Sequence, residues 1–354
     1  MTEGWEGRMT LVQRLFNFKT SILAGSLAFF CIAQAQDLPS VEKNLTETAP
    51  TPTPAPAASP TPESVIENFC RRVDEQYSRY GWENSQCRRI PWIFSQTSEK
   101  NYPLVYWVLE SGAPSKEGRP FEDTTLFLGG VHGDEPSGVY VLFKFANELL
   151  SNPELADHHR VIIAPLVNPD GFFARTRNNS RGVDLNRNFP TKDFNKSALI
   201  VWKKRRKGNP QHFPGYTSGS EAGTQFQMKL LDAFEPDKIF SLHSPLDFVD
   251  YDGPGSTKRK SALSTGEYRA QQIAQIFAKK TRNYRVVSYQ FFPGSLGNYA
   301  GNERNIPTIT LEFSSSNPKA ANKHWADVVN ALRAGVNYEF KRVTLAKTES
   351  KKTK

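Results

Sequence analysis

Short apolar runs of strand length alternate with longer amphipathic stretches of helix length from about residue 102 onward. This alternation favours an α/β domain whose sheet is covered by helices on both faces. We therefore predict a mixed, largely parallel and twisted β-sheet flanked by helices. The expected strands are 104–109, 125–131, 160–167, 238–242, 285–290 and 308–313, and the expected helices are 65–80, 137–150, 268–281 and 320–340.

Three short polar motifs lie at the ends of predicted strands, which is where open α/β sheets place their ligands. They are His132-Gly133-Asp134-Glu135, Ser241-Leu242-His243-Ser244 and Thr310-Leu311-Glu312. Two imidazoles and one carboxylate form a ligand set that leaves a tetrahedral zinc ion one open position for water. We therefore predict that His132, Glu135 and His243 bind one Zn²⁺ per chain.

A second carboxylate, Glu312, ends the predicted strand 308–313. Partial desolvation there would raise its pKa toward a value suited to taking a proton from water, so we expect it to be the general base. The run 182–189 contains an Asn-Arg pair suited to holding an anion, which predicts a substrate with a carboxylate. The remaining histidines lie outside such motifs and are expected on the surface: His158, His159, His212 and His324.

The first 35 residues have the pattern of an export signal. Arg8, Arg14 and Lys19 precede an apolar stretch over 21–32, and Ala33-Gln34-Ala35 fits a small-x-small cleavage site. The apolar stretch is short for a membrane span, which needs about 20 residues. We therefore expect a cleaved signal peptide, no stable transmembrane span afterwards, and export to the periplasm or the extracellular space; an uncleaved anchor is the alternative.

Residues 36–63 are rich in Pro, Thr, Ala and Ser, which predicts a disordered linker. An N-terminal segment over 64–98 follows, with a disulfide expected between Cys70 and Cys87 because two cysteines in an exported chain usually pair. Two free buried thiols are the alternative. The catalytic domain is expected over 99–342 and a basic tail over 343–354.

The chain carries a net charge of +9, with its densest basic runs at 203–207 and 351–354. We interpret both runs as solvated surface, and attraction to an anionic cell-envelope surface is the alternative. No basic motif with interleaved aromatic residues is present, so we expect no nucleic-acid partner.

The motifs together resemble those of the M14 zinc carboxypeptidase family, over roughly residues 100–340. The similarity is closest to the bacterial murein peptide amidases, which cleave between γ-D-glutamate and diaminopimelate in cell-wall peptides. The resemblance implies a zinc carboxypeptidase-like fold. It depends on 129–135, 168–171, 184–189, 242–244 and Glu312, with further support from 182–190, 220–224 and 293–297.

The resemblance also implies roles for individual residues. Asn186 and Arg187 match the pair that binds the terminal carboxylate of the substrate, a task that suits the planar guanidinium group. Arg177 matches the arginine that polarises the scissile carbonyl, with Arg175 and Arg181 as neighbouring alternatives. Asp184 matches the carboxylate that orients the first zinc-binding histidine.

Three further features concern a tyrosine before Glu312 and the residues that follow the third ligand. The family has a mobile tyrosine before the catalytic glutamate, and Tyr299 is the expected substrate-binding counterpart, one place out of register. Family members also carry a cis peptide after the third ligand, so we predict a cis Ser244-Pro245 bond. The following acidic residues are expected either to bind a cationic or amino group of the substrate or to be solvated: Asp247, Asp250 and Asp252.

These observations predict a zinc-dependent peptidase with a peptide or muropeptide as its substrate. We expect it to hydrolyse an amide bond next to a carboxylate in murein peptides, at the bond between γ-D-glutamate and diaminopimelate. The main alternative is a general secreted metallocarboxypeptidase that acts on ordinary peptide C-termini. A non-catalytic envelope-binding module is disfavoured because all four residues of the predicted centre are present.

Overall fold

The computed structural model describes residues 61–340, apart from 113–120, 254–264 and 283. The predicted signal peptide, almost all of the predicted linker and the predicted tail 343–354 lie outside these residues. Within the described ranges, no helix is both long enough and apolar enough to cross a lipid bilayer.

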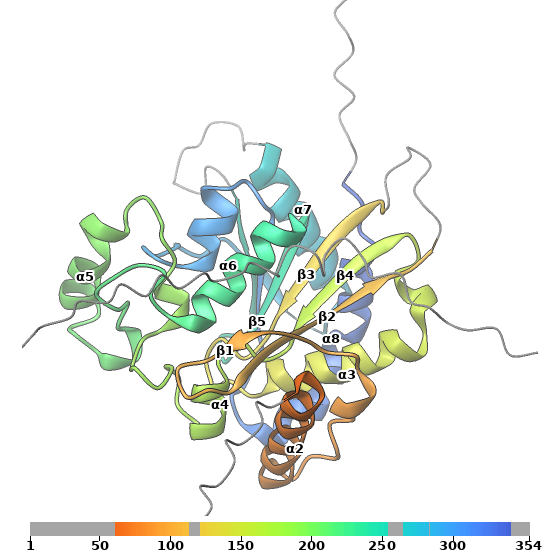
Figure 1. The fold of residues 1–354 in the computed structure, drawn as a ribbon. Helices are drawn as coiled ribbons and strands as arrows, with labels where there is room; N and C mark the ends of the chain where they lie inside the picture. The colour runs from red at the N-terminus through yellow and green to blue at the C-terminus, as the bar shows by residue number, and fades with distance from the viewer. Residues whose placement is uncertain (1–60, 113–120, 254–264, 283, 341–354) are drawn as a thin grey trace, which may run out of the picture. The chain divides into compact units, whose positions relative to one another are not determined.

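One eight-stranded sheet runs through the domain in the order β1-β2-β4-β3-β5-β8-β6-β7 (Figure 1). The central strands β4, β3, β5 and β8 are mutually parallel, whereas the pairs β1–β2, β2–β4 and β6–β8 are antiparallel. The predicted mixed, largely parallel sheet is therefore confirmed. The strands are β1 (Ile93–Thr97), β2 (Pro103–Glu110), β3 (Asp123–Leu128), β4 (His159–Ala164), β5 (Lys238–His243), β6 (Phe248–Asp252), β7 (Arg285–Val287) and β8 (Thr308–Glu312).

Helices cover both faces of the sheet, as predicted. On one face, the ring of Phe240 in β5 stacks on Phe277, and Gly335 lies against the same ring. On the other face, Tyr106 of β2 packs edge to face against Phe234. The helices are α2 (Pro62–Tyr80), α3 (Ser137–Ser151), α4 (Pro169–Ala174), α5 (Phe194–Arg205), α6 (Ala222–Phe234), α7 (Thr265–Lys280) and α8 (Ala321–Val336).

The N-terminal segment begins with a well-capped helix. The hydroxyl of Thr61 accepts a hydrogen bond from the backbone of Ser64 at the start of α2, and Gly81 ends the helix with φ of 71°. The predicted disulfide is present, because Cys70 of α2 is bonded to Cys87 in the following turn. Both sulfur atoms are therefore fixed within the core, where the two cysteines are fully buried.

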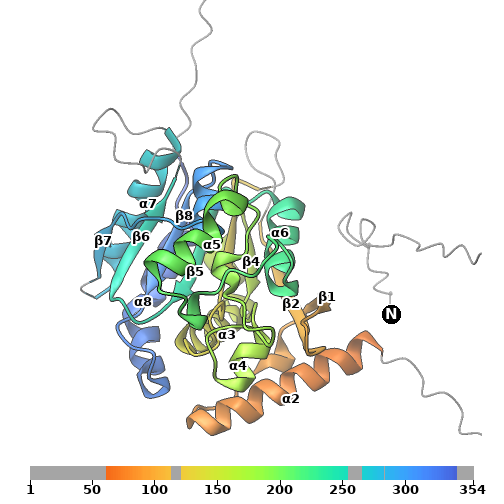
Figure 2. The same cartoon turned by 90° about the vertical axis from the view of Figure 1, so that its left-hand side faces the viewer.

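The N-terminal segment packs against helices of the predicted catalytic domain. Phe69 stacks on Phe143 of α3, and Tyr80 contacts Phe172 of α4. Figure 2 shows α2 beside both helices. The strand β1, also inside the segment, forms the edge of the sheet. The segment therefore completes the hydrophobic core of the domain.

Two histidines that were expected on the surface are buried, because each has polar partners in the interior. His159 is 3% exposed and its Nδ1 lies 2.9 Å from Asp123 Oδ1. His324 is fully buried, stacks on Phe313, and has Nδ1 2.9 Å from the hydroxyl of Ser137. The expectation is wrong for both residues, since hydrogen bonding offsets the cost of burying an imidazole.

Candidate active site

Close backbone packing shapes the turn that follows β3. Gly133 lies so near Gly171 that a Cβ atom on it would come within 2.0 Å of the carbonyl carbon of Gly171. Asn168 donates hydrogen bonds from its amide nitrogen to the carbonyl oxygens of Val131 and Arg177, both at 3.1 Å. The glycine and asparagine of the two motifs thus form one rigid support for the first two predicted ligands.

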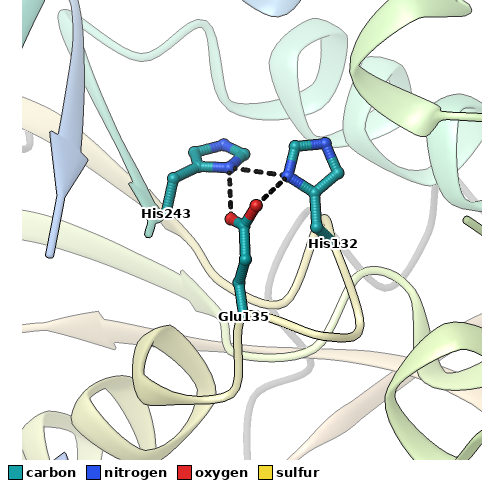
Figure 3. A group of neighbouring side chains, drawn as sticks. All are labelled: His132, Glu135 and His243. Carbon is teal, nitrogen blue, oxygen red and sulfur yellow. Dashed lines mark hydrogen bonds and ion pairs between the residues drawn. The ribbon is translucent and has the colours of Figure 1, made fainter. Parts of the chain in front are cut away.

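The three predicted ligands converge, although His243 comes from β5, far along the chain (Figure 3). His132 Nδ1 lies 2.8 Å from Glu135 Oε1, and His243 Nδ1 lies 3.0 Å from Glu135 Oε2. The two Nδ1 atoms are 3.1 Å apart. All three residues are at least 95% buried.

The outward contacts of the imidazoles show that this donor set fits a zinc ion. His132 Nε2 lies 3.1 Å from Asp184 Oδ1, and His243 Nε2 lies 3.0 Å from the hydroxyl of Ser241. The Asp184 carboxylate favours the proton on Nε2 of His132, and the Ser241 hydroxyl can accept a proton from Nε2 of His243. In this arrangement the lone pair of each Nδ1 points to the shared centre. Together with the carboxylate of Glu135, these atoms form the two-imidazole, one-carboxylate set of catalytic zinc sites.

Arg177 links the ligand cluster to Asp184. Its guanidinium donates to Glu135 Oε1 at 3.0 Å and to Asp184 Oδ2 at 3.1 Å. Burial opposes ionisation of Asp184, but the positive charge of Arg177, followed by His132, outweighs it and holds the pKa of Asp184 well below its usual range. Asp184 therefore stays ionised and keeps His132 oriented, which is the contact that the resemblance implied.

Glu312 lies next to His243 in the sheet, because the register of β5 and β8 pairs these two residues. Its Oε2 accepts a weak hydrogen bond from the backbone of Leu246 at 3.4 Å. Burial, and after it the negative charge of Glu135, raises the pKa of Glu312 to about 8. A carboxyl group with this pKa exchanges protons near neutral pH, as general acid–base catalysis requires.

A cavity of about 480 Å³ opens beside the cluster and is lined by all three ligands, Glu312 and Arg177. Its wall also contains Asn186 and Arg187. The carbonyl oxygen of the Asn186 side chain accepts a hydrogen bond from the backbone of Leu296 at 2.8 Å, which leaves its amide nitrogen to donate to a ligand.

Arg187 is held against the opposite loop of this cavity. Its guanidinium lies 4.4 Å from the centre of the Phe292 ring, and burial lowers its pKa to about 10, so it remains a cation at neutral pH. The Asn-Arg pair therefore offers a neutral donor and a charged donor side by side for one carboxylate.

Tyr299 does not line the cavity, which corrects its expected role as a substrate contact. Its ring stacks on Phe189 and lies under the guanidinium of Arg304. Tyr289 lines the cavity instead, with 48% of its surface exposed. In the sequence, Tyr289 falls inside the predicted strand 285–290, so no role at the site was expected for it. In the structure β7 ends at Val287, and Tyr289 lies in the loop that follows.

Two further cavity residues were missed because only the tertiary fold brings them there. Arg206, expected in a solvated basic run, lines the cavity and lies 4.7 Å from the Phe292 ring centre. His212, expected on the surface, also lines the cavity, and its Nδ1 is 3.8 Å from Asp184 Oδ2. Neither residue has a sequence motif of its own that would have shown this.

The segment after the third ligand follows the prediction in part. The Ser244-Pro245 bond is cis, as expected. Asp250 and Asp252 line the cavity and are buried, whereas Asp247 is exposed and lies outside the lining. Only two of the three acidic residues are therefore placed to meet a substrate.

Comparison with known proteins agrees with this geometry. Residues 95–331 match the Zinc carboxypeptidase family. Murein peptide amidase A of Escherichia coli strain K12 is 32% identical over 214 residues, which cover 60% of this chain and 80% of that protein. The chain belongs to the zinc carboxypeptidase family and is a metallopeptidase.

Solved structures of more distant relatives share the fold. Bovine thrombin-activatable fibrinolysis inhibitor, in complex with tick carboxypeptidase inhibitor, matches with a TM-score of 0.55 and 17% identity over 77% of this chain and 95% of that chain. Carboxypeptidase A from Helicoverpa armigera matches with a TM-score of 0.55 and 15% identity over 78% of this chain and 72% of that chain. At these identities the two matches support the fold.

Proposed function

We propose that this protein is a zinc-dependent peptidase that hydrolyses an amide bond next to a free carboxylate in cell-wall peptides. The bond is the one between γ-D-glutamate and diaminopimelate. A single observation carries the proposal: one cavity contains a metal-ligand set, a buried carboxyl group and an Asn-Arg pair. The likeness to murein peptide amidase A of Escherichia coli supports the choice of cell-wall peptides.

His132, Glu135 and His243 hold one zinc ion in this proposal. The bound metal supplies a Lewis acid that makes water more acidic and polarises a carbonyl group. The protein holds the two imidazole rings in a fixed orientation. Nε2 of His132 contacts Asp184, and Nε2 of His243 contacts Ser241.

Five side chains carry out the remaining steps. Glu312 takes a proton from the attacking water and returns it to the leaving amine, which its raised pKa permits. Arg177 stabilises the negative charge that develops on the carbonyl oxygen. Asn186 and Arg187 hold the substrate carboxylate and so fix which bond meets the centre. Tyr289, in place of Tyr299, lines the cavity and contacts the substrate.

The proposal includes export to the periplasm or the extracellular space, where cell-wall peptides are found. The signal-like residues 1–35 support it. The net charge of +9 would also favour association with an anionic envelope surface.

Mass spectrometry of products from purified muropeptides tests this function. The wild-type protein should release a fragment that begins with diaminopimelate, and a chelator should prevent the release until zinc is restored. Ordinary C-terminal peptide substrates form the comparison. If the protein removes the last residue of these peptides but leaves the muropeptides uncleaved, a general carboxypeptidase is favoured instead.

A further inference from the structure

The carboxyl group of Glu312 has few fixed contacts of its own. Among the described residues it accepts one hydrogen bond, from the backbone of Leu246 at 3.4 Å. Its place is therefore set mainly by the backbone of β8. This strand is paired with β5, and just beyond it the backbone of Phe313 donates to the carbonyl oxygen of His243 at 2.8 Å. A contact that holds the end of β8 thus also holds this carboxyl group in place.

His324, in the first turn of α8, contacts the end of β8 and the start of α3 at the same time. Its ring stacks on Phe313 with the ring centres 4.7 Å apart, and its Nε2 lies 3.3 Å from the hydroxyl of Ser314. On the other side, its Nδ1 lies 2.9 Å from the hydroxyl of Ser137, the first residue of α3. One imidazole ring therefore connects two separate elements.

Both points of contact lie close in sequence to residues of the site. Ser137 follows the proposed metal ligand Glu135 by two residues, and Ser314 follows Glu312 by two residues. Because both hydroxyl groups bond to the same ring, the turn that bears Glu135 and the strand end that bears Glu312 are held at a fixed separation.

The imidazole of His324 is suited to this link because it is neutral. Burial, and after it the charge of Lys323, lowers its pKa to about 4. A neutral imidazole has one nitrogen that donates and one that accepts, so it can bond to both hydroxyl groups. Ser137 is fully buried, so its bond to the ring lies in the interior of the protein. The link is therefore intact at neutral pH.

The helix that carries this ring is anchored to α3 by other contacts, and the two helices lie side by side (Figure 1). The hydroxyl of Tyr140 in α3 donates to the side chain of Asn322 in α8. Further along the same pair of helices, Arg333 forms an ion pair with Glu148. The helix α8 is therefore a fixed support from which the ring reaches the end of β8.

We propose that His324 is a positioning residue that holds Glu312 at its working distance from the metal centre. It acts through Ser137 and the end of β8, and it does not itself line the substrate cavity. The inference rests on the proposed function, because that function makes Glu312 the general base. A reacting group misplaced by about 1 Å can lower a rate about 100-fold, so loss of the link should reduce kcat.

The double variant Ser137→Ala, His324→Phe breaks the link with little loss of stability. Phenylalanine keeps a ring against Phe313, and no buried hydroxyl group is left without a partner. In the zinc-loaded variant, kcat for a muropeptide should fall by about tenfold or more, whereas KM should change by less than about twofold. Zinc content should remain at one per chain.

His159→Gln is the matched control. His159 is a similarly buried histidine with a polar partner, but it lies at the start of β4, away from the site. This variant should unfold at a lower denaturant concentration than the wild-type protein and keep the wild-type kcat. The comparison separates positioning of Glu312 from a general loss of stability.

Amide hydrogen exchange of the zinc-loaded proteins tests the link without turnover. A peptide that covers residues 308–314 should exchange about tenfold faster in the double variant than in the wild-type protein, because the end of β8 has lost a support. A peptide from β4 should exchange at the wild-type rate in the same variant.

A folded, zinc-loaded double variant with wild-type kcat would overturn the inference, and so would unchanged exchange over 308–314. An equal decrease in kcat in His159→Gln would also overturn it, because loss of stability would then explain both results. Failure of the proposed function gives a different result. The wild-type protein would cleave no muropeptide, while exchange over 308–314 would still be faster in the double variant, which would keep the link and remove the reaction.

Discussion

Glu312 combines two properties that rarely coincide in a carboxyl group. It pairs in the sheet with His243, a proposed metal ligand, and its pKa is raised to about 8 by burial and by Glu135. At neutral pH both protonation states are accessible to such a group, so one side chain can accept a proton and later donate it.

Glu312→Gln should lower kcat by about 10²–10⁴-fold, because the amide cannot accept a proton from water. Zinc content should remain at one per chain, since Glu312 is not a ligand. Turnover of a muropeptide, with zinc measured on the same sample, checks this. Glu83→Gln, at an exposed position, is the control. Near-normal turnover by the Glu312 variant would remove its assigned role.

Arg187→Gln should lower kcat/KM about 10- to 100-fold for substrates with a free carboxylate, because a charged hydrogen bond contributes roughly 1.5–3 kcal/mol. The loss should be much smaller for the same peptide with a terminal carboxamide. Arg205→Gln, on the exposed side of α5, serves as the matched control. An equal decrease in kcat/KM for both substrates would show that Arg187 does not bind the carboxylate.

At the scale of the elements, side chains on three adjacent strands point alternately toward the cavity and toward the core, and those that point toward the cavity form part of the site. Ser241 and His243 of β5 line the cavity beside Thr310 and Glu312 of β8, while residues between them face the core. The sequence motifs predicted the ends of both strands because these motifs interrupt apolar runs. The neighbouring strand β6 was missed, since its alternating acidic residues look like a solvated loop when burial is unknown.

A disulfide between Cys70 and Cys87 joins α2 to the turn that follows it. Replacing Cys70 and Cys87 by alanine should lower the free energy of unfolding by about 3 kcal/mol, as expected from closing a loop with a sequence separation of 17. Urea denaturation of zinc-loaded proteins measures this loss. An unchanged midpoint and slope would show that packing of α2 alone fixes the segment.

At the scale of the whole molecule, a buried ion cluster lies at the amino ends of the parallel strands, opposite the proposed metal ligands at their carboxyl ends. Lys238 at the start of β5 is fully buried and donates to Asp123 at the start of β3. It also donates to the backbone carbonyl of Tyr338, beyond α8, at 2.8 Å. One ammonium group therefore joins the sheet to the C-terminal end of the described domain.

Asp123→Asn should lower the free energy of unfolding by about 3–5 kcal/mol, because it leaves the charge of Lys238 buried without a counter-charge. The double variant Asp123→Asn, Lys238→Met should recover part of this loss. Chemical denaturation compares both with Asp157→Asn, an exposed change. A double variant less stable than Asp123→Asn alone would contradict the explanation.

The fold class and the convergence of His132, Glu135 and His243 could be predicted from the sequence, because both leave periodic or spaced local patterns. Part of the cavity wall could not be predicted, since Arg206 at the end of α5 and Tyr289 after β7 reach it only through the tertiary fold. The ion cluster could not be predicted either. Its members are single polar residues at the starts of separate strands, and only the sheet register brings them together: Asp123, His159 and Lys238.

Zinc content per chain is the measurement that tests the central claim most directly. After dialysis against zinc and removal of unbound metal, the wild-type protein and Glu312→Gln should each retain one zinc ion. His132→Ala, Glu135→Ala and His243→Ala should each retain far less at the same free zinc concentration. One tightly bound zinc in all three alanine variants would contradict a shared metal centre, and with it the proposed chemistry.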